Sequence, residues 1–357
     1  MDIRIVSLSD EQKKPLFTDE SKLFFGRIFT DRMFMVEWKV ERGWFDARIE
    51  PYAPFVLDPA CMVLHYAQEI FEGLKAYKWQ DCSIALFRPE MNARRFIRSA
   101  ERMCMPEVPE DLFLRGIEEL VKLEKNWIPS SPGTSLYIRP TMIAVEPALG
   151  VKPSDHYYFY VILCPVGPYY STGFNPVRIM VEDNYVRAVP GGTGDTKTGG
   201  NYAASLKAAL EAKKKGFEQV LWLDGAHHRY VEEVGSMNMF FAYGDLVVTA
   251  PLTGSILNGV TRDSVIKLAD SLGFRLEERQ IDINDLMADI RSGMVTEAFG
   301  SGTAAVITSV GHLAYLGETH QVGEGGVGRL TRKLYDTLTG IQYGRIEDPF
   351  GWIRKIA

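Results

Sequence analysis

The spacing of apolar residues along the first half of the chain switches between the periods of strands and of helices. Nearly uninterrupted apolar stretches of strand length occur at 33–38, 84–87 and 157–164, and each predicts a β-strand. Residues 92–103 and 112–126 instead carry apolar side chains along one side at helical spacing, which predicts two amphipathic helices. The first half is therefore expected to combine a sheet with helices.

The second half alternates strand-like and helix-like segments. Helices are predicted at 203–215, 261–272 and 284–291, and strands at 220–223, 239–243, 246–249 and 295–299. The predicted helix at 261–272 would begin with Thr261 as its N-cap and stop before Gly273. Gly244-Asp245 lies between two of these strands and predicts a hairpin turn.

A segment rich in proline and glycine separates the two halves. Three prolines and two glycines fall between Pro165 and Pro176, a composition typical of a linker. We therefore expect two domains of mixed α+β and α/β type, a smaller one at 1–165 and a larger one at 177–357, joined by 166–176. Aromatic residues in the linker are either packing anchors or part of a substrate wall.

Composition and charge exclude several classes of function. The formal net charge of the 357 residues is −6, without a long basic run, which argues against a nucleic-acid or anionic-membrane binder. No apolar stretch is long enough to span a bilayer, and residues 1–14 do not have the pattern of a targeting peptide. The four cysteines have no C-x-x-C spacing, so we expect reduced, mostly buried thiols of a cytosolic protein. The six histidines fit no metal-ligand pattern, and no metal is expected.

Lys197 is the first candidate for chemistry. It stands between Gly191-Gly192 with Gly194 on one side and Gly199-Gly200 on the other, directly before the helical run at 203–215. Glycines let a ligand approach the backbone closely, and such a lysine suits a Schiff base with an aldehyde. The alternatives for this segment are a helix cap, an anion-binding loop and a surface charge.

Two further segments have the composition of phosphate cradles. Gly259-Val260-Thr261 opens a predicted helix, whose first N–H groups attract anions. Gly300-Ser301-Gly302-Thr303 follows a predicted strand and is expected to act as a loop with flexible donors. Each alone is equally consistent with an ordinary turn. Together with Lys197 they suggest a phosphorylated aldehyde, that is, pyridoxal 5′-phosphate.

That cofactor requires a carboxylate beside its pyridine nitrogen. The candidate is Glu233 in Glu232-Glu233-Val234-Gly235-Ser236-Met237-Asn238. A buried glutamate needs a cationic partner, and a pyridinium would provide one. Glu232 would face the other way in an extended segment and is expected to be a solvated acid.

At this point the sequence resembles the branched-chain-amino-acid aminotransferases, which are fold-type IV pyridoxal-phosphate enzymes. The resemblance extends from Phe25-Gly26 to Gln342-Tyr343-Gly344. It depends on five motifs in order: Phe71-Glu72-Gly73-Leu74-Lys75-Ala76-Tyr77, Tyr137-Ile138-Arg139-Pro140, Lys197-Thr198-Gly199-Gly200-Asn201-Tyr202, Glu233-Val234-Gly235-Ser236-Met237-Asn238 and Phe299-Gly300-Ser301-Gly302-Thr303. It implies the D-amino-acid-aminotransferase-like architecture, with the cofactor between the domains, and a cytoplasmic homodimer.

The resemblance also implies roles at individual positions. Lys197 would hold the cofactor as an internal aldimine and move the substrate's α-proton. Glu233 would pair with the pyridine nitrogen, and Tyr202 would bind the ring hydroxyl. The phosphate would be bound by Arg95, Val260, Thr261 and Thr303. Arg94 and Arg98 resemble solvated neighbours of Arg95.

Substrate binding is implied at a second set of positions. The side-chain pocket would be formed by Phe25, Tyr66, Phe71, Tyr137 and Tyr169. Ser236 and the amides of Thr303 and Ala304 would bind the α-carboxylate, with Arg139 supporting the wall. For Phe25 and Phe71, plain core packing is an equally good interpretation.

The chain departs from some members of the family in two places. The redox C-x-x-C that follows the Gly-Ser-Gly-Thr motif in those members is replaced here by Ala304-Ala305-Val306-Ile307. Ser236 stands where many relatives have threonine and keeps the hydroxyl.

The expected activity is reversible amino transfer from Leu, Ile or Val to 2-oxoglutarate, giving glutamate and branched-chain 2-oxo acids. The alternatives are another fold-type IV enzyme, namely a D-amino-acid or amine transaminase or a lyase, and a cofactor-binding regulator without turnover.

Overall fold

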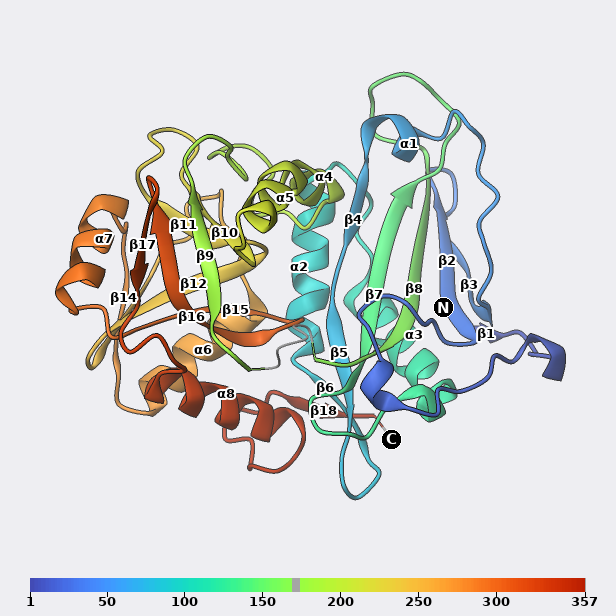
Figure 1. Cartoon of the computed structure of the whole chain (residues 1–357). Coiled ribbons are helices and arrows are strands. Elements are labelled where there is room, and N and C mark those ends of the chain that lie inside the picture. The colour runs from blue at the N-terminus through green and yellow to red at the C-terminus, as the bar shows by residue number, and fades with distance from the viewer. Residues whose placement is uncertain (169–173, 357) are drawn as a thin grey trace. The chain divides into compact units, whose positions relative to one another are not determined.

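The computed structural model describes residues 1–168 and 174–356, and these residues form two compact units (Figure 1). The first unit contains 1–168, 196–199 and 341–356. The second contains 174–195 and 200–340. These groups differ from the domain boundaries expected from the sequence, because the Lys197 segment and the last residues of the chain belong to the first unit.

The first unit is built on one sheet of mostly antiparallel strands. Its strand order is β1-β3-β2-β8-β7-β5-β6-β18, with β4 paired to β7. Only β1 and β3 pair in parallel among the strands described in this unit. The elements are β1 (Arg4–Ile5), β2 (Arg32–Lys39), β3 (Gly43–Pro51), α1 (Met62–Tyr66), β4 (Glu69–Phe71), β5 (Leu74–Lys78), β6 (Ile84–Phe87), α2 (Pro89–Arg102), α3 (Glu110–Leu123), β7 (Ser135–Ala144), β8 (His156–Val166) and β18 (Ile353–Lys355).

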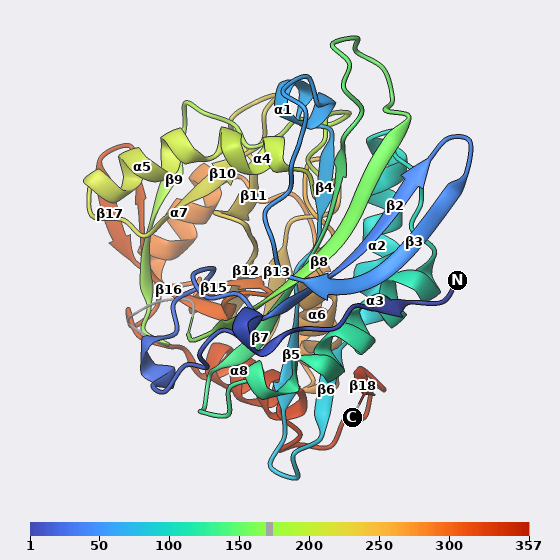
Figure 2. The same ribbon diagram turned by 90° about the vertical axis from the view of Figure 1, so that its right-hand side faces the viewer.

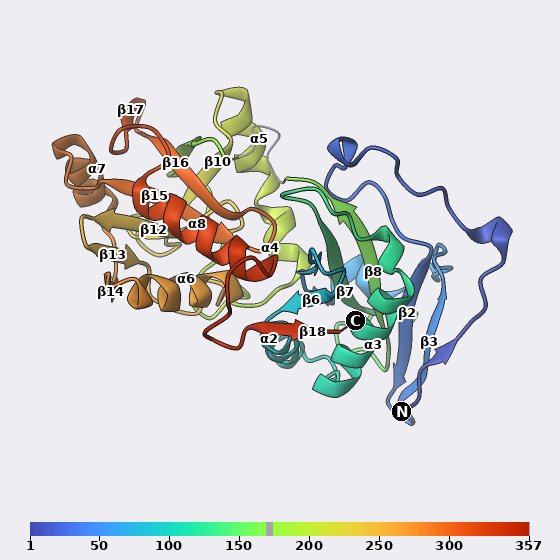
Figure 3. The same ribbon diagram turned by 90° about the horizontal axis from the view of Figure 1, so that it is seen from below.

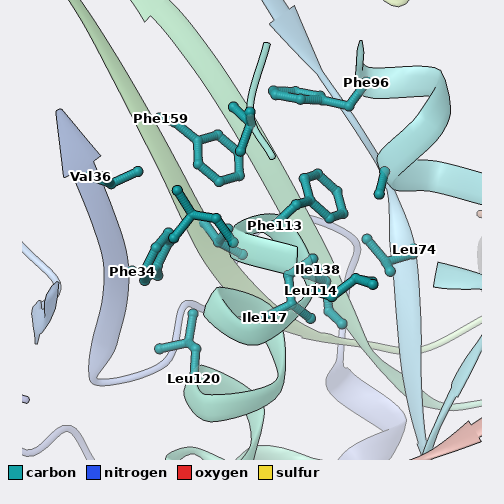
Figure 4. Packing of buried hydrophobic residues seen from close by; sticks show 14 of the residues in the cluster. Phe34, Val36, Leu74, Phe96, Phe113, Leu114, Ile117, Leu120, Ile138 and Phe159 are labelled. Carbon is teal, nitrogen blue, oxygen red and sulfur yellow. The ribbon is translucent and has the colours of Figure 1, made fainter. Parts of the chain in front are cut away.

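Helices α2 and α3 lie along the sheet strands β2, β7 and β8, as Figure 2 shows. The core between them is aromatic: Phe96 of α2 and Phe113 of α3 lie 5.2 and 5.8 Å from the ring of Phe159 on β8 (Figure 4). All three side chains are almost fully buried. Such ring pairs add about 0.5–1.5 kcal/mol each beyond burial. This packing fixes α2 and therefore the neighbouring polar residues that it carries.

The second unit is built on a sheet that closes on itself. The strand order is β11-β10-β9-β16-β15-β12-β13-β14, and an extra pairing of β11 with β12 closes the first part of this order into a ring. Closure removes the unpaired strand edges there. The elements are β9 (Val177–Glu182), α4 (Gly199–Ala204), α5 (Leu206–Lys214), β10 (Gln219–Leu223), β11 (Val231–Val234), β12 (Met237–Tyr243), β13 (Leu246–Thr249), α6 (Val260–Ser271), β14 (Arg275–Glu278), α7 (Ile283–Ser292), β15 (Glu297–Gly302), β16 (Val306–Tyr315), β17 (Glu318–Gln321) and α8 (Arg329–Gln342).

Helices cover the outside of this second sheet. Helix α6 packs against β14 and β15, and the start of α8 donates hydrogen bonds to Glu297 of β15 (Figure 3). The interior of the ring is apolar, with Val234, Phe241 and Ile179 fully buried. Within the described residues no helix has the length and apolar character needed to cross a membrane.

Most predicted elements are confirmed, including β2, β6, β8, α2, α3 and the hairpin of β12 and β13. Three details were wrong. The N-cap of α6 is Gly259, so Thr261 lies inside the first turn. The predicted helix 203–215 is two helices, because at Ser205 both the amide and the hydroxyl bond to the carbonyl of Tyr202. The strand predicted at 295–299 is β15, shifted to 297–302.

Candidate active site

The Lys197 segment is held in the first unit by hydrogen bonds that each involve a main-chain atom. The Lys197 amide donates to the hydroxyl of Ser99 on α2 at 3.1 Å, and its carbonyl accepts from the Phe71 amide at 2.9 Å. The hydroxyl of Thr198 donates to the carbonyl of Glu69 at 2.8 Å. Thr196 and Thr198 are buried, whereas Lys197 is half-buried. The segment is therefore held through atoms that do not include the lysine side chain.

The Lys197 ammonium lies over an aromatic ring and near a carboxylate. Its Nζ is 4.6 Å from the centroid of the Phe71 ring, a cation–π distance. The positive charge of Lys197 also acts on the carboxylate of Glu72. The amine therefore has an aromatic ring and a carboxylate of the first unit in its surroundings.

Glu72 forms a buried ion pair with Arg95, which projects from α2. Arg95 donates from Nε to one carboxylate oxygen at 2.6 Å and from its terminal nitrogen to the other at 2.9 Å. Asn92 and the Gly73 amide donate to the second oxygen at 2.8 and 3.0 Å. Burial alone would raise the pKa of Glu72, but Arg95, Lys197 and Asn92 together hold that pKa below its ordinary value. Glu72 is therefore a fixed anion.

Aromatic side chains and one arginine extend this cluster. The rings of Phe25 and Tyr137 meet edge to face at 4.7 Å. The guanidinium of Arg139 lies 4.7 Å from the Phe71 ring and donates to the Tyr137 hydroxyl at 3.2 Å. A side chain at Gly73 would collide with that hydroxyl, so glycine is required there. The first unit thus brings together Phe25, Phe71, Arg95, Tyr137, Arg139 and Lys197.

In the second unit, Glu233 is buried in the closed sheet on β11. It forms an ion pair with Arg187 and accepts from Asn238 at 3.0 Å and from the Leu257 amide at 3.2 Å. Arg187 in turn donates to the carbonyls of Gly194 and Ser255 at 2.8 and 3.2 Å. The carboxylate therefore already has a protein cation beside it.

Asn238 connects Glu233 to the N-terminus of α6. Its amide nitrogen donates both to Glu233 and, at 2.9 Å, to the carbonyl of Leu257. A side chain at Gly259, the N-cap of α6, would collide with the Asn238 oxygen. The chain therefore reaches the helix in close contact with Asn238. The first amides of this helix, at Val260 and Thr261, lie at its positive end.

The segment 300–303 differs from its prediction. Gly300 and Ser301 lie inside β15, paired on both sides with β12 and β16, so their amides belong to the sheet ladder and not to a loop. The turn comprises residues 303–305, which include Thr303 and Ala304, before β16. A Cβ at Gly302 would lie 3.9 Å from the Ser236 carbonyl oxygen. Ser236 and the start of this turn are thus neighbours.

Glu232 was expected to be solvated, and this prediction was wrong. The residue is only 5% exposed, and its carboxylate accepts from the Ser255 hydroxyl. Burial raises the pKa of Glu232, against the effects of Ser255 and Arg187. The reason is that all four residues of β11 (Val231–Val234) are buried, so both faces of the strand are covered.

The remaining predicted residues have the following positions. Tyr66 lies on α1 and donates from its hydroxyl to the Leu149 carbonyl. Tyr202 lies on α4 and is half-buried. Arg94 and Arg98 are exposed, as predicted. Tyr169 lies outside the described residues.

Comparison with known proteins identifies the family of this chain. The family described as Amino-transferase class IV matches residues 69–313. Branched-chain-amino-acid aminotransferase 2 of Bacillus subtilis (strain 168) is 51% identical over 355 residues, which cover 99% of this chain and 97% of that protein. The chain belongs to the class IV aminotransferase family.

Solved structures give the same family. The crystal structure of the Escherichia coli branched-chain amino acid aminotransferase has a TM-score of 0.74 and 27% identity, covering 90% of this chain and 99% of its own. The branched-chain aminotransferase from the thermophilic archaeon Thermoproteus uzoniensis, solved with norvaline, has a TM-score of 0.72 and 26% identity, covering 91% and 100%. The fold is that of fold-type IV enzymes.

This class IV aminotransferase uses pyridoxal 5′-phosphate, and its residues fit that group chemically. The cofactor has an aldehyde, a phosphate and a basic ring nitrogen. The first unit supplies an amine, Lys197, and a guanidinium, Arg95. The second supplies a buried carboxylate, Glu233, and the opening amides of α6. Its substrates are amino acids and oxo acids.

Three residues of these clusters were not among the sites predicted from the aminotransferase sequence. Glu72 lies in the motif 71–77, but no role was predicted for it. A glutamate inside a strand-like apolar segment is nevertheless a signal of a paired buried charge. Asn238 lies in the motif 233–238, and no role was predicted for it either. Arg187 had no sequence signal, because its partner Glu233 is 46 positions away along the chain (233 − 187).

The cysteines of the aminotransferase lead to a redox prediction. Among the described residues the four thiols are unpaired, with Cys61 and Cys164 buried and Cys82 and Cys104 exposed, so the expectation of mostly buried thiols holds for only two. Burial raises the pKa of both buried thiols, which slows their oxidation. Mild peroxide should therefore leave activity nearly unchanged. A large loss that a thiol reductant restores would contradict this, and activity measured before and after reductant decides it.

Proposed function

We propose that this enzyme reversibly transfers the amino group of Leu, Ile or Val to 2-oxoglutarate, giving the branched-chain 2-oxo acid and glutamate. The observation that carries the proposal is Lys197 beside an aromatic wall and a buried Glu72–Arg95 pair, in a chain half identical to a branched-chain aminotransferase over nearly its full length. We further propose that the enzyme works as a cytoplasmic homodimer.

In this proposal the cofactor is bound by an amine, by hydroxyls, by a guanidinium, by a carboxylate and by helix amides. Lys197 holds its aldehyde carbon, and Tyr202 donates to its ring hydroxyl. The guanidinium of Arg95, the amides of Val260 and Thr261, and Thr303 bind its phosphate, as expected for a cation and a helix N-terminus. Glu233, which forms an ion pair with Arg187, accepts from the protonated ring nitrogen.

Proton transfer is assigned to Lys197. The bound cofactor supplies the electron sink that makes the substrate's α-proton acidic. The Nζ of Lys197 would accept that proton as a general base and would then donate it back as a general acid. The main-chain bonds to Ser99 and Phe71 hold the lysine backbone while its side chain moves.

Substrate selection is assigned to the aromatic cluster and to the turn after β15. Phe25, Phe71 and Tyr137 offer apolar surface to the side chain of the amino acid. Tyr66 and Tyr169 are included on the family resemblance. Ser236 and the amides of Thr303 and Ala304 bind the α-carboxylate.

An aromatic pocket should select branched aliphatic side chains. Leucine has three more carbons than alanine, and each buried methylene contributes about 0.8 kcal/mol, so kcat/KM should favour leucine by roughly 50-fold. Aspartate should be rejected, because its side-chain carboxylate would lose water without gaining a partner. Steady-state kinetics with Leu, Ile, Val, Ala and Asp test this. Comparable values for alanine and leucine would contradict the pocket assignment.

Arg139 should matter more to the dicarboxylic substrate than to leucine. Glutamate and 2-oxoglutarate bring a second carboxylate, and the guanidinium of Arg139 lies over the rings of Phe71 and Tyr137. Arg139→Ala should slow the 2-oxoglutarate half-reaction about tenfold more than the leucine half-reaction. Stopped-flow measurement of each half-reaction separates them, and equal losses would make Arg139 a structural residue.

The proposed function itself is tested with a panel of L- and D-amino acids and amines, each with 2-oxoglutarate as acceptor. We expect turnover with L-Leu, L-Ile and L-Val and very little with their D-forms or with primary amines. Preference for a D-amino acid or an amine would instead identify another activity of the same family. The absence of any amino transfer would contradict the proposal.

A further inference from the structure

Glu72 is a buried carboxylate whose four hydrogen bonds come from three neighbours. It lies between β4 and β5 and is fully buried. Its second oxygen accepts from Asn92, from the Gly73 amide and from Arg95 at 2.8, 3.0 and 2.9 Å, and its first oxygen accepts from Arg95 Nε at 2.6 Å. Asn92 and Gly73 therefore fix the carboxylate independently of the arginine.

Main-chain hydrogen bonds hold the backbone on either side of Glu72, and its side chain adds one bond, to the Gly73 amide. The Glu72 amide donates to the Pro140 carbonyl at 2.8 Å, and the Phe71 amide donates to the Lys197 carbonyl at 2.9 Å. A buried carboxylate is costly to desolvate, and an apolar residue at this position would avoid that cost. What the carboxylate does fix is the plane and direction of the Arg95 guanidinium, through two parallel bonds.

We propose that Glu72 is a positioning residue, which holds Arg95 in the orientation that binds the phosphate of the cofactor. The inference rests on the proposed role of Arg95 as a phosphate ligand. An arginine on an exposed helix face would lose rotamer entropy on meeting the anion. Held by Glu72 and by α2, whose Phe96 is fully buried, Arg95 meets the phosphate already oriented.

The charge of Glu72 and its positioning role have opposite effects on the affinity for the cofactor. A carboxylate near a phosphate repels it, so a residue acting only through its charge would weaken cofactor binding, and its removal would strengthen binding. Removal of a positioning residue would instead weaken cofactor binding. The sign of the change in cofactor affinity therefore distinguishes the two roles.

The test compares pyridoxal 5′-phosphate with pyridoxal, which has the same aldehyde and ring but no phosphate. Dissociation constants for both are measured by absorbance titration of the full-length protein freed of cofactor. The variants are Glu72→Gln, which removes the charge, and Glu72→Asp, which keeps the charge but withdraws the carboxylate by one methylene. Arg95→Lys reports on the phosphate role itself, and thermal unfolding of each variant monitors the fold.

Glu124→Gln is the matched control. Glu124 is 1% exposed and pairs with Arg32 at 2.7 Å in the same unit, so this variant also disrupts a buried ion pair. It is expected to lower thermal stability and to leave both dissociation constants unchanged.

We expect Glu72→Gln and Glu72→Asp each to raise the dissociation constant for the phosphorylated cofactor about tenfold, with little change for pyridoxal. Should Glu72→Gln fail to fold, Glu72→Asp carries the same expectation. Equal losses for both ligands, no change, or tighter binding of the phosphorylated one would overturn the inference. If Arg95→Lys selectively weakens the phosphorylated ligand while the Glu72 variants do not, only the inference fails. If Arg95→Lys has no selective effect, the proposed phosphate role of Arg95 fails.

Discussion

Lys197→Ala should reduce amino transfer by at least about 10⁴-fold, because both the attachment of the cofactor and the transfer of the α-proton depend on this amine. The fold should survive. The contacts of residue 197 with Ser99 and Phe71 use main-chain atoms, which alanine keeps. A change in Tm of no more than about 3 °C is expected. Turnover with leucine and 2-oxoglutarate, measured beside thermal unfolding, separates the two effects.

Lys75→Met is the matched control for this substitution. Lys75 is also a lysine of the first unit and is only 7% exposed. Burial lowers the pKa of Lys75 to about 8. By its pKa, Lys75 is therefore an alternative candidate for the nucleophilic amine. Methionine replaces it with an unbranched side chain of similar length. Near-normal turnover of Lys75→Met is expected, and near-normal turnover of Lys197→Ala would refute the assignment.

Glu233→Gln should lower kcat by about 100-fold or more, equivalent to about 2.7 kcal/mol of transition-state stabilisation. An amide at this position carries no charge to stabilise a protonated ring nitrogen. The amide would also leave Arg187 buried without its counter-ion. Single-turnover kinetics with leucine measure the chemical step apart from cofactor retention, which should fall far less.

Glu232→Gln is the comparison built into the chain. The neighbouring glutamate is equally buried, but its hydrogen bond comes from the hydroxyl of Ser255 and not from Asn238 or the Leu257 amide. Its substitution should change kcat by no more than a few-fold, although the loss of a buried hydrogen bond costs about 1 kcal/mol of stability. Equal effects of the two substitutions on the chemical step would mean that the wrong glutamate has been assigned.

The pattern of apolar residues was sufficient to predict elements whose faces differ in burial. Helix α3 repeats apolar side chains at helical spacing, and strand β8 is a nearly uninterrupted apolar run; both begin within two residues of the predicted starts. The Gly300–Gly302 segment was misread because glycines favour loops in isolation. Here they lie in a strand between β12 and β16, where a Cβ at Gly300 would collide with Val234 and Met237. Only tertiary packing reveals that reason.

The partners of the site residues were harder to predict than the residues themselves. Lys197 and Glu233 stand in recognisable local contexts. Arg187 and Glu72 act through contacts between segments far apart in the sequence, Arg187 with Glu233 and Glu72 with Arg95. Periodicity carries no information about such pairs. Glu232 was misjudged for a related reason, since tertiary packing buries both faces of β11, all four of whose residues are buried.

The central claim is that Lys197 is the residue that holds the cofactor. It is tested most directly by reducing the protein, loaded with pyridoxal 5′-phosphate, with borohydride and mapping the modified peptide by mass spectrometry. Borohydride fixes the cofactor covalently to the amine that holds it. The mass of the reduced cofactor is expected on the peptide containing Lys197 and on no other lysine. Modification of Lys75, or of any lysine in place of Lys197, would contradict the account.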